Sequence, residues 1–305
     1  MKGKAYRIYR PGCPHHVYWR GDGGRVIFYS VEDCLCFFTL YSCLARKYGI
    51  LVRGFCMMPN HIHANEQAPC SQSFISFHGA LNSRFTVLYN REHDRSGPLF
   101  ESPFGFAAKT VGKRVRDNLC YIANNPVVGN LAGDIDSYRW NLLAYNCSDH
   151  PFSEKIALSR ASRKLRRAVE KVRYFRARNL PLDYVRISQI FGELDSWDRN
   201  RLSDYVVAQY NFLDYDAMAS FYGKSFRQAT LSFRSNSGSE HDIPEDFENY
   251  GNYQQMILIA RNEGISLSRC NFRKADEQVL ARLVYIFQGQ GFPERQIERF
   301  LHLLE

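Results

Sequence analysis

The order of strand-like and helix-like segments in the first 145 residues constrains the fold most. Short β-favouring runs occur at 16–19, 50–57 and 61–66, and the run 25–28 is expected to extend the first across a glycine-rich turn. Apolar residues recur at helical spacing in 30–48, 71–89 and 110–124. This order predicts an α+β fold in which helices cover one face of an antiparallel sheet.

Local signals define the ends of these helices. Ser30 is expected to cap the first helix, with Asp33 three residues on, and Gly49 is expected to stop it. The third helix is expected to end by Pro126, because the residue before a proline disfavours helical geometry.

The second half of the chain has a different character. Strand signals are few after residue 152, and residues 160–178 hold nine Lys or Arg and one Glu, in a chain of net charge +9. We expect two domains, 1–148 with the sheet and 149–305 mostly α-helical and basic, the second with possible DNA binding. The candidate phosphate contacts there are Arg163, Lys164, Arg166 and Arg167, against the alternative of a solvated linker helix.

Two helical segments near the end, 275–288 and 293–304, are separated by Gly289-Gln290-Gly291. Such an arrangement is typical of a helix-turn-helix, with Arg295 and Arg299 exposed on the second helix. A plain helical hairpin that packs its apolar stripe explains the same pattern.

Cysteine usage and hydropathy indicate the compartment. The nine cysteines include no Cys-x-x-Cys pair and many lie in apolar stretches, which favours free thiols in a reducing cytoplasm over a structural zinc site. No apolar run approaches the length of a membrane span. We therefore expect a soluble, cytoplasmic protein with no membrane partner.

The sequence Pro59-Asn60-His61-Ile62-His63 carries the first chemical signal. Residues two apart on a strand point to the same side, so His61 and His63 are expected to present two imidazoles on one face. Neutral imidazole is a good ligand for divalent metals, but two ligands alone bind weakly.

A second signal, Tyr-x-x-x-Asn-Pro, ends the third predicted helix. Tyr121 and Asn125 are four residues apart and share a helix face, so the helix could bring the Asn125 amide oxygen to the metal as a third ligand and the Tyr121 hydroxyl beside it. A metal acting as Lewis acid on a phosphate would then make Tyr121 a candidate nucleophile. The cations expected to hold DNA phosphates are Lys109, Lys113, Arg114 and Arg116.

Each signal alone has an ordinary structural explanation. A His-x-His pair can be two packed histidines, a tyrosine near a helix end can be a packing residue, and basic residues on a helix can be a solvated face. The functional interpretation depends on the two motifs occurring together and in this order in a basic chain.

These residues resemble those of a known family, the REP-associated tyrosine transposases, relatives of the smallest single-tyrosine insertion-sequence transposases. Residues 55–63 resemble the family's motif of two histidines that flank a hydrophobic residue, and 121–127 resemble its nucleophile motif. Residues 15–21 and 138–140 carry a weaker likeness. The resemblance spans roughly residues 12 to 145.

The resemblance implies a ferredoxin-like or RRM-like catalytic fold, Mg²⁺ or Mn²⁺ as cofactor, and cleavage of single-stranded DNA at or near a hairpin. It implies that Tyr121 forms a 5′-phosphotyrosine and releases a 3′-hydroxyl, and that another 3′-hydroxyl rejoins the strand in a transposition reaction. His61 and His63 match the metal ligands, whereas at Asn125 the insertion-sequence relatives use glutamine. A homodimer is implied by the family alone.

The chain also departs from the family. Val128 stands where arginine is usual, Asn65-Glu66 follows the histidine motif, and residues 155–305 lie outside the resemblance. Two other classes of function stay open. One is a non-catalytic DNA-binding protein derived from such a transposase, and the other is a metal-dependent nuclease that uses water in place of Tyr121.

Overall fold

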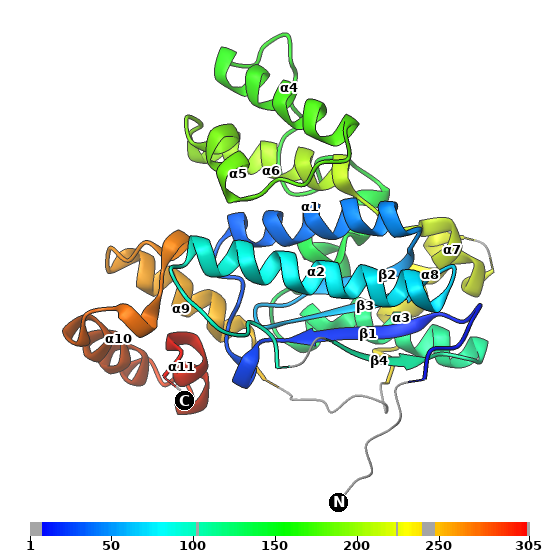
Figure 1. Cartoon of the computed structure of the whole chain (residues 1–305), viewed down its shortest axis with the longest axis horizontal. Helices are drawn as coiled ribbons and strands as arrows, with labels where there is room; N and C mark the ends of the chain where they lie inside the picture. Colours follow the sequence, from blue (N-terminus) through cyan, green and yellow to red (C-terminus); the bar gives the residue numbers. More distant parts are fainter. Residues whose placement is uncertain (1–7, 102–103, 224, 240–247, 304–305) are drawn as a thin grey trace, which may run out of the picture.

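The computed structural model describes residues 8–101, 104–223, 225–239 and 248–303; Leu304, the expected end of the last helix, lies outside them. Across those ranges it contains one four-stranded sheet and eleven α-helices (Figure 1). The predicted α+β class is confirmed. The strands are β1 (His15–Arg20), β2 (Leu51–Met57), β3 (His61–Gln67) and β4 (Gly105–Ala108).

The sheet has the strand order β2-β3-β1-β4, and every neighbouring pair is antiparallel. The edge strand β4 was not predicted from the sequence. The strand expected at 25–28 was wrong, because these residues form a loop around the turn before β3. The backbone N–H groups of Ile27 and Phe28 both donate to the Pro59 carbonyl, at 2.9 and 3.0 Å, and so join no strand ladder.

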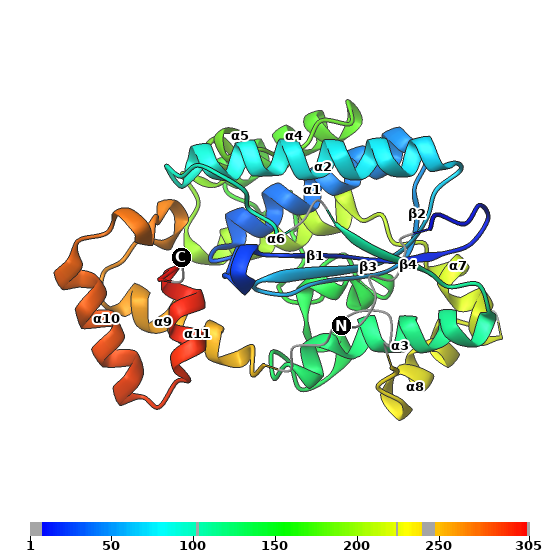
Figure 2. The ribbon, with the colours of Figure 1, turned by 60° about the horizontal axis from the view of Figure 1, so that its bottom comes forward.

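Helices α1 (Val31–Tyr48) and α2 (Ser71–Glu92) cover one face of the sheet (Figure 2). The predicted ends of α1 are confirmed: Ser30 and Asp33 form a reciprocal capping box, and Gly49 ends the helix at φ 68°. The buried Trp19 of β1 points to this face, where its ring lies 6.4 Å from those of Phe37 and Tyr41.

Helix α3 (Gly112–Val128) lies on the opposite face, so the expectation that helices cover only one face was wrong (Figure 2). Gly54 of β2 permits this packing, since a Cβ at that position would lie 2.9 Å from Leu119 Cδ2. The side chains of β1 and β3 that alternate away from α1 and α2 therefore face α3.

Pro126 lies inside α3, and the expectation that the helix ends before it was also wrong. Its missing N–H removes only one helical hydrogen bond, and this loss falls in the last turn. The carbonyls of this turn are used instead by residues that follow. Gly129 N donates to Asn125 O at 2.9 Å, and Leu131 N donates to Pro126 O at 2.8 Å.

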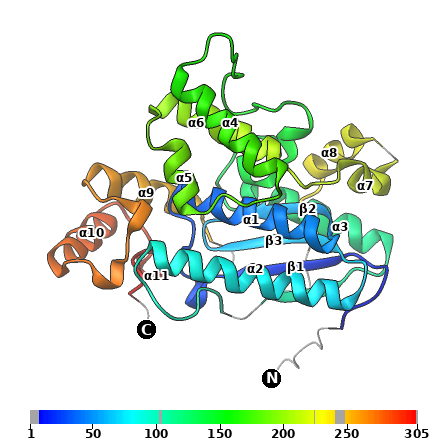
Figure 3. The same cartoon turned by 45° about the horizontal axis from the view of Figure 1, so that its top comes forward.

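The described residues after 148 form helices and loops, with a single isolated β-bridge at Leu213. Helices α4 to α6 stack on the outer side of α1, α7 and α8 lie beside α3, and α9 to α11 lie beyond one end of the sheet (Figures 1 and 3). The bounds of these helices are α4 (Arg163–Ala177), α5 (Tyr184–Phe191), α6 (Ser196–Tyr210), α7 (Tyr215–Ala219), α8 (Phe226–Ser235), α9 (Gly251–Asn262), α10 (Glu277–Gly289) and α11 (Glu294–Leu301).

The two halves of the chain share a hydrophobic core. One cluster of buried residues joins the sheet, α1 and α2 to apolar residues of α4, α5 and α6. As a result, thirteen consecutive residues of α1, from Asp33 to Ala45, are buried. A helix that is buried on all sides is an interior element and not a surface one.

The last helix, α11, packs against the loop 21–29. The side chain of Arg299 in α11 is 3% exposed and ion-paired with Glu248, so the expectation that Arg299 is exposed for DNA contact was wrong. Its backbone carbonyl accepts a hydrogen bond from Val26 N at 3.2 Å. Arg295 is exposed, as expected. The inner face of α11 is therefore a packing face.

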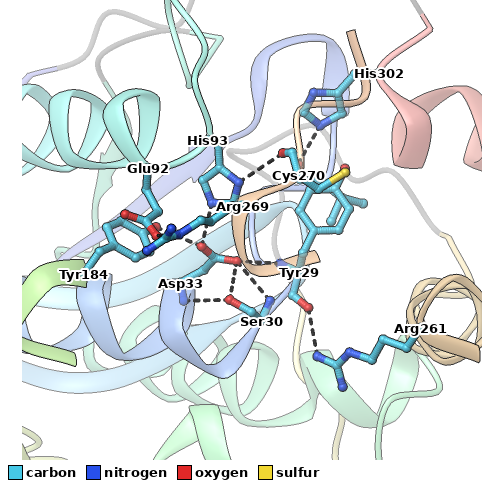
Figure 4. A network of polar contacts seen from close by, with 11 residues as sticks. Tyr29, Ser30, Asp33, Glu92, His93, Tyr184, Arg261, Arg269, Cys270 and His302 are labelled. Carbon is cyan, nitrogen blue, oxygen red and sulfur yellow. Dashed lines mark hydrogen bonds and ion pairs between the residues drawn. The ribbon is translucent and has the colours of Figure 1, made fainter. Parts of the chain in front are cut away.

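A buried carboxylate joins four parts of the chain (Figure 4). Asp33 is 0% exposed; its Oδ1 accepts from Tyr184 Oη at 2.8 Å and from His93 Nε2 at 2.9 Å. Its Oδ2 accepts from Tyr29 N, Ser30 N and Ser30 Oγ at 2.8–3.1 Å. His93 also contacts the Cys270 carbonyl through Nδ1 at 3.1 Å. These bonds tie the start of α1, the end of α2, α5 and the segment at residue 270 to one another.

None of the helices in the described ranges is both long and apolar enough to cross a bilayer.

Candidate active site

Strand β3 places His61 and His63 side by side on the face toward α3. The antiparallel register sets them opposite Arg20 and Tyr18 of β1, and their ring centroids lie 4.9 Å apart. His61 is half-buried and His63 is 4% exposed. The expected pair of imidazoles on one face is therefore present at the position where α3 crosses the sheet.

A third histidine, His16 of β1, completes this group and was not predicted as a site residue. Its Nε2 lies 2.9 Å from His63 Nδ1, and its side chain is 0% exposed. The sequence gives no local sign of this contact, because it arises only when β1 pairs with β3.

Tyr121 lies over these rings from α3. Its ring centroid is 5.3 Å from that of His63 and 5.8 Å from that of His16, in edge-on contact with both. The tyrosine is half-buried, so its phenol is neither sealed in the core nor displayed on open surface. Two motifs separated by about sixty residues in sequence thus meet in space.

The surroundings keep His63 neutral. Burial lowers the pKa of its imidazole well below the ordinary value, and the neighbouring His61 and His16 add to this effect. A neutral imidazole retains the lone pair that a metal requires.

The donor set fits a divalent cation, which the family resemblance implies. His61 and His63, whose ring centroids lie 4.9 Å apart, would hold such an ion through one nitrogen each. The described part of the chain holds no cluster of three His, Cys, Asp or Glu side chains arranged for a metal. Within those residues, a further ligand from a side-chain amide or a backbone carbonyl is compatible with this finding. The amide expected in this role is that of Asn125, whose Nδ2 donates to Tyr121 O at 3.0 Å.

The predicted phosphate contacts on α3 and just before it divide into two groups. Lys113, Arg114 and Arg116 are exposed, and Arg114 precedes Tyr121 by seven residues, almost two full helical turns, so the two side chains share a face. Lys109, in contrast, is only 4% exposed. The expectation of a surface phosphate contact at Lys109 does not hold, because its side chain is enclosed next to the end of β4.

The basic residues of α4 lie far from this site. Arg163, Lys164 and Arg166 are exposed, as is Arg167, but α4 stands on the α1 side of the sheet, whereas Tyr121 lies on the α3 side (Figures 1 and 2). Lys164 Nζ lies 3.9 Å from Glu193 Oε2, and both side chains are well exposed, so this ion pair is weak. The α4 cations therefore form a separate surface.

Residues from the second half of the chain cover part of the site. The ring of Tyr250, which is 7% exposed, lies 5.1 Å from that of His61. Gly238 packs against α3 so closely that a Cβ there would lie 2.4 Å from Tyr121 N. Sequence reasoning missed both contacts, because neither residue belongs to a motif.

The chain has a structural likeness to a known protein but no match in sequence. No family model matches the chain, and no curated protein matches it significantly. A solved structure described as the REP-associated tyrosine transposase bound to a REP hairpin is similar at a TM-score of 0.41 and 16% sequence identity, over 46% of this chain and 82% of that chain. The protein in that structure bears the name of the family that the two motifs resemble.

Proposed function

We propose that this protein is a transposase-like enzyme that cuts and rejoins single-stranded DNA, with Tyr121 as nucleophile. One observation carries the proposal: a half-buried phenol on α3 lies 5.3 Å, centroid to centroid, from a neutral, buried imidazole of a two-histidine strand. The element order β1-α1-β2-β3-α2-β4, with strand order β2-β3-β1-β4, supports a ferredoxin-like assignment for this part of the chain.

The chemistry is a transesterification. The Tyr121 oxygen attacks a backbone phosphorus, the new O–P bond forms, and the bond from phosphorus to the 3′ oxygen breaks. The phenol loses its proton and the leaving oxygen gains one, which gives a 5′-phosphotyrosine and a free 3′-hydroxyl. A second 3′-hydroxyl reverses the step and rejoins the strand, so the bond energy is conserved and no nucleotide cofactor is consumed.

His61 and His63, with Asn125 as the third protein ligand, would hold Mg²⁺ or Mn²⁺. When bound, such an ion neutralises charge on the phosphoryl oxygens and orients the phosphate for in-line attack. The protein's own contribution is position: α3 fixes the phenol above the strand, and Arg114 offers a cation on the same helix face for a neighbouring phosphate.

The proposed partner is single-stranded or hairpin DNA, because the nucleophile and the exposed cations of α3 suit a phosphodiester backbone. The α4 residues Arg163, Lys164, Arg166 and Arg167 would contact a different stretch of the same DNA, since they lie on another side of the molecule. A cytoplasmic location is supported by the nine cysteines, all of which are free. A homodimer would supply two tyrosines for the exchange of two ends.

The test uses a hairpin oligonucleotide labelled at its 3′ end, incubated with the protein and Mn²⁺ or Mg²⁺ and then denatured. The proposal predicts a labelled covalent protein adduct, which Tyr121→Phe abolishes. Tyr138→Phe is a matched control that removes a buried hydroxyl bonded to Met57 O and retains the adduct. If Tyr121→Phe cleaves the hairpin as much as the wild type does and the products have free ends, the tyrosine mechanism is refuted and a nuclease that uses water is favoured.

The cover over the site favours a second candidate, a DNA-binding protein that no longer cleaves. Tyr250 and Gly238 pack directly on His61 and on the backbone of Tyr121. This alternative predicts hairpin binding that weakens steeply with salt and no adduct with either metal. Any adduct that depends on Tyr121 eliminates it.

A further inference from the structure

The outer face of α4 carries positive charge that the described part of the chain does not balance. Residues 163–178 hold eight Lys or Arg and one Glu. The acid Glu193 lies 3.9 Å from Lys164, whereas within the described residues no carboxylate lies within ion-pairing distance of Arg163 or Arg167. Like charges three and four residues apart on a helix destabilise it. An anionic partner on this face would remove that repulsion.

An aromatic ring lies in the middle of this charged face. Tyr174 follows Arg163 by eleven residues, about three helical turns, so the two side chains lie on one line along α4. The residues with which α4 packs against α5 and α6 lie on the opposite side of the helix; they are Leu165, Ala168, Val169 and Val172. Tyr174 is 52% exposed and is not part of the hydrophobic core. The fold therefore does not explain why an aromatic residue stands at this position.

The Tyr174 ring is paired with a cation of the same helix face. The guanidinium carbon of Arg178 lies 3.8 Å from the ring centroid, and Arg178 follows Arg167 by eleven residues, again about three turns. Aromatic rings and arginine side chains within a basic surface are the groups on which unpaired bases stack. In a duplex the faces of the bases are covered by their neighbours, so an exposed ring has no such partner there. The combination on α4 thus suits a single strand better than a duplex.

We propose that the outer face of α4 binds an unpaired stretch of DNA, with Arg163 and Arg167 on its phosphates and Tyr174, backed by Arg178, stacked on a base. That the strand is DNA rests on the proposed function above. From Arg163 to Tyr174 the helix rises about 16 Å, which matches about five nucleotides at the spacing of one duplex strand. Because α4 stands on the α1 side of the sheet, this stretch lies outside the segment presented to Tyr121 (Figure 1).

An anionic lipid surface is the other polyanion that a basic helix can meet. A helix that lies on a membrane buries an apolar face among the lipids. The apolar residues of α4 are already buried against α5 and α6, and its outer face is mainly charged. The structure therefore favours nucleic acid, and vesicles provide the comparison.

The first experiment locates the contact. A single-stranded oligonucleotide with 5-iodouracil in place of thymine is mixed with Tyr121→Phe in the absence of metal and irradiated, which crosslinks iodouracil to aromatic rings that it touches. Mass spectrometry of the peptides is expected to find a crosslink at Tyr174. The absence of a crosslink at Tyr174 would overturn the proposal. Neither result depends on whether the protein cleaves DNA.

The second experiment separates stacking from charge by equilibrium binding of a fluorescent, unstructured oligonucleotide. Tyr174→Leu is expected to weaken this binding by about 5–100-fold with no change in its salt slope, because no charge is lost. Tyr174→Phe retains the ring and should bind as the wild type does. Alanine at both Arg163 and Arg167 should reduce the salt slope by about 1.4. Tyr285→Leu is the matched control, since Tyr285 is 79% exposed on α10.

The outcomes are distinct. If folded Tyr174→Leu, checked by circular dichroism, binds the single strand as tightly as the wild type, or loses as much affinity for a duplex of the same length, the proposal is overturned. It also fails if vesicles of anionic lipid displace the oligonucleotide from the wild type but not from Tyr174→Leu. An absent Tyr121 adduct together with an intact effect of Tyr174→Leu would contradict the proposed function alone.

Discussion

Replacing Asp33 with asparagine tests the buried network that joins α1, α2, α5 and the segment at residue 270. The carboxylate accepts five hydrogen bonds, and an amide has only one acceptor oxygen. In either orientation the new NH₂ group faces at least two donors, and each unsatisfied buried donor costs about 1–3 kcal/mol. Loss of the charge also leaves His93 without its buried partner, a change that typically costs about 3–5 kcal/mol. We expect Asp33→Asn to lower the free energy of unfolding by about 3–5 kcal/mol.

The same network gives stability a defined dependence on pH. His93 Nδ1 faces a carbonyl and Nε2 faces a carboxylate, so the protonated ring, which donates from both nitrogens, suits both partners. Burial opposes this charge, but the hydrogen bond and the charge of Asp33 outweigh burial and raise the pKa of His93 above 6.5. The folded state therefore binds the proton more tightly, and this stabilisation is present below pH 6.5 and lost as the pH rises through the folded pKa. Its slope is at most about 1.4 kcal/mol per pH unit.

The assay is urea unfolding followed by tryptophan fluorescence at pH 6 and pH 8. We expect the wild type to lose stability relative to His93→Gln between these two values. Asp134→Asn is the control, since Asp134 is about half exposed and its pair with Arg234 contributes at most about 1 kcal/mol. The reasoning is refuted if Asp33→Asn lowers the free energy of unfolding by less than about 1 kcal/mol. It is also refuted if the wild type becomes more stable relative to His93→Gln as the pH rises.

Three further predictions concern surface positions. Arg114→Ala should weaken binding of single-stranded DNA and reduce its salt slope by about 0.7, whereas Arg116→Ala, which lies on another face of α3, should change it less; equal losses in a filter-binding assay would contradict this. A triple variant with alanine at Arg163, Arg166 and Arg167 of α4 should bind a long hairpin more weakly but give the same adduct yield on a short hairpin. A lower adduct yield on the short hairpin would count against a separate DNA-binding surface on α4. Gly79→Ala, in the exposed middle of α2 with open space around its Cβ position, should raise the free energy of unfolding by about 0.5–1 kcal/mol, and a loss in urea unfolding would be the opposite result.

The sequence predicted correctly those elements whose ends depend on contacts between residues close in sequence. Ser30, Asp33 and Gly49 define α1 through a capping box and a left-handed stop, all within contacts of a few residues. Strand β4 was missed because four residues, Gly105–Ala108, hold no β-branched side chain and form a strand only beside β1. The extension of α3 past Pro126 likewise depends on acceptors that downstream residues satisfy.

The candidate site shows the same division. Alternation along a strand and the i, i+4 relation on a helix were enough to predict that His61 would share a face with His63 and that Tyr121 would be presented from a helix. The inclusion of His16, the burial of Lys109 and the cover by Tyr250 were not predictable, because each is a contact between segments distant in sequence. Those contacts follow from strand register and from packing of the second half of the chain.

The complete enclosure of α1 limits how this molecule can be shortened. The inner side of α1 meets the sheet, and its outer side meets α5 and α6. A fragment that stops at residue 148 would therefore expose a continuous surface of aromatic and aliphatic side chains to water. Such a fragment is expected to aggregate rather than act as a miniature enzyme. A compact derivative would require new polar residues along the outer side of that helix, and the same requirement applies to any natural lineage that lost the second half.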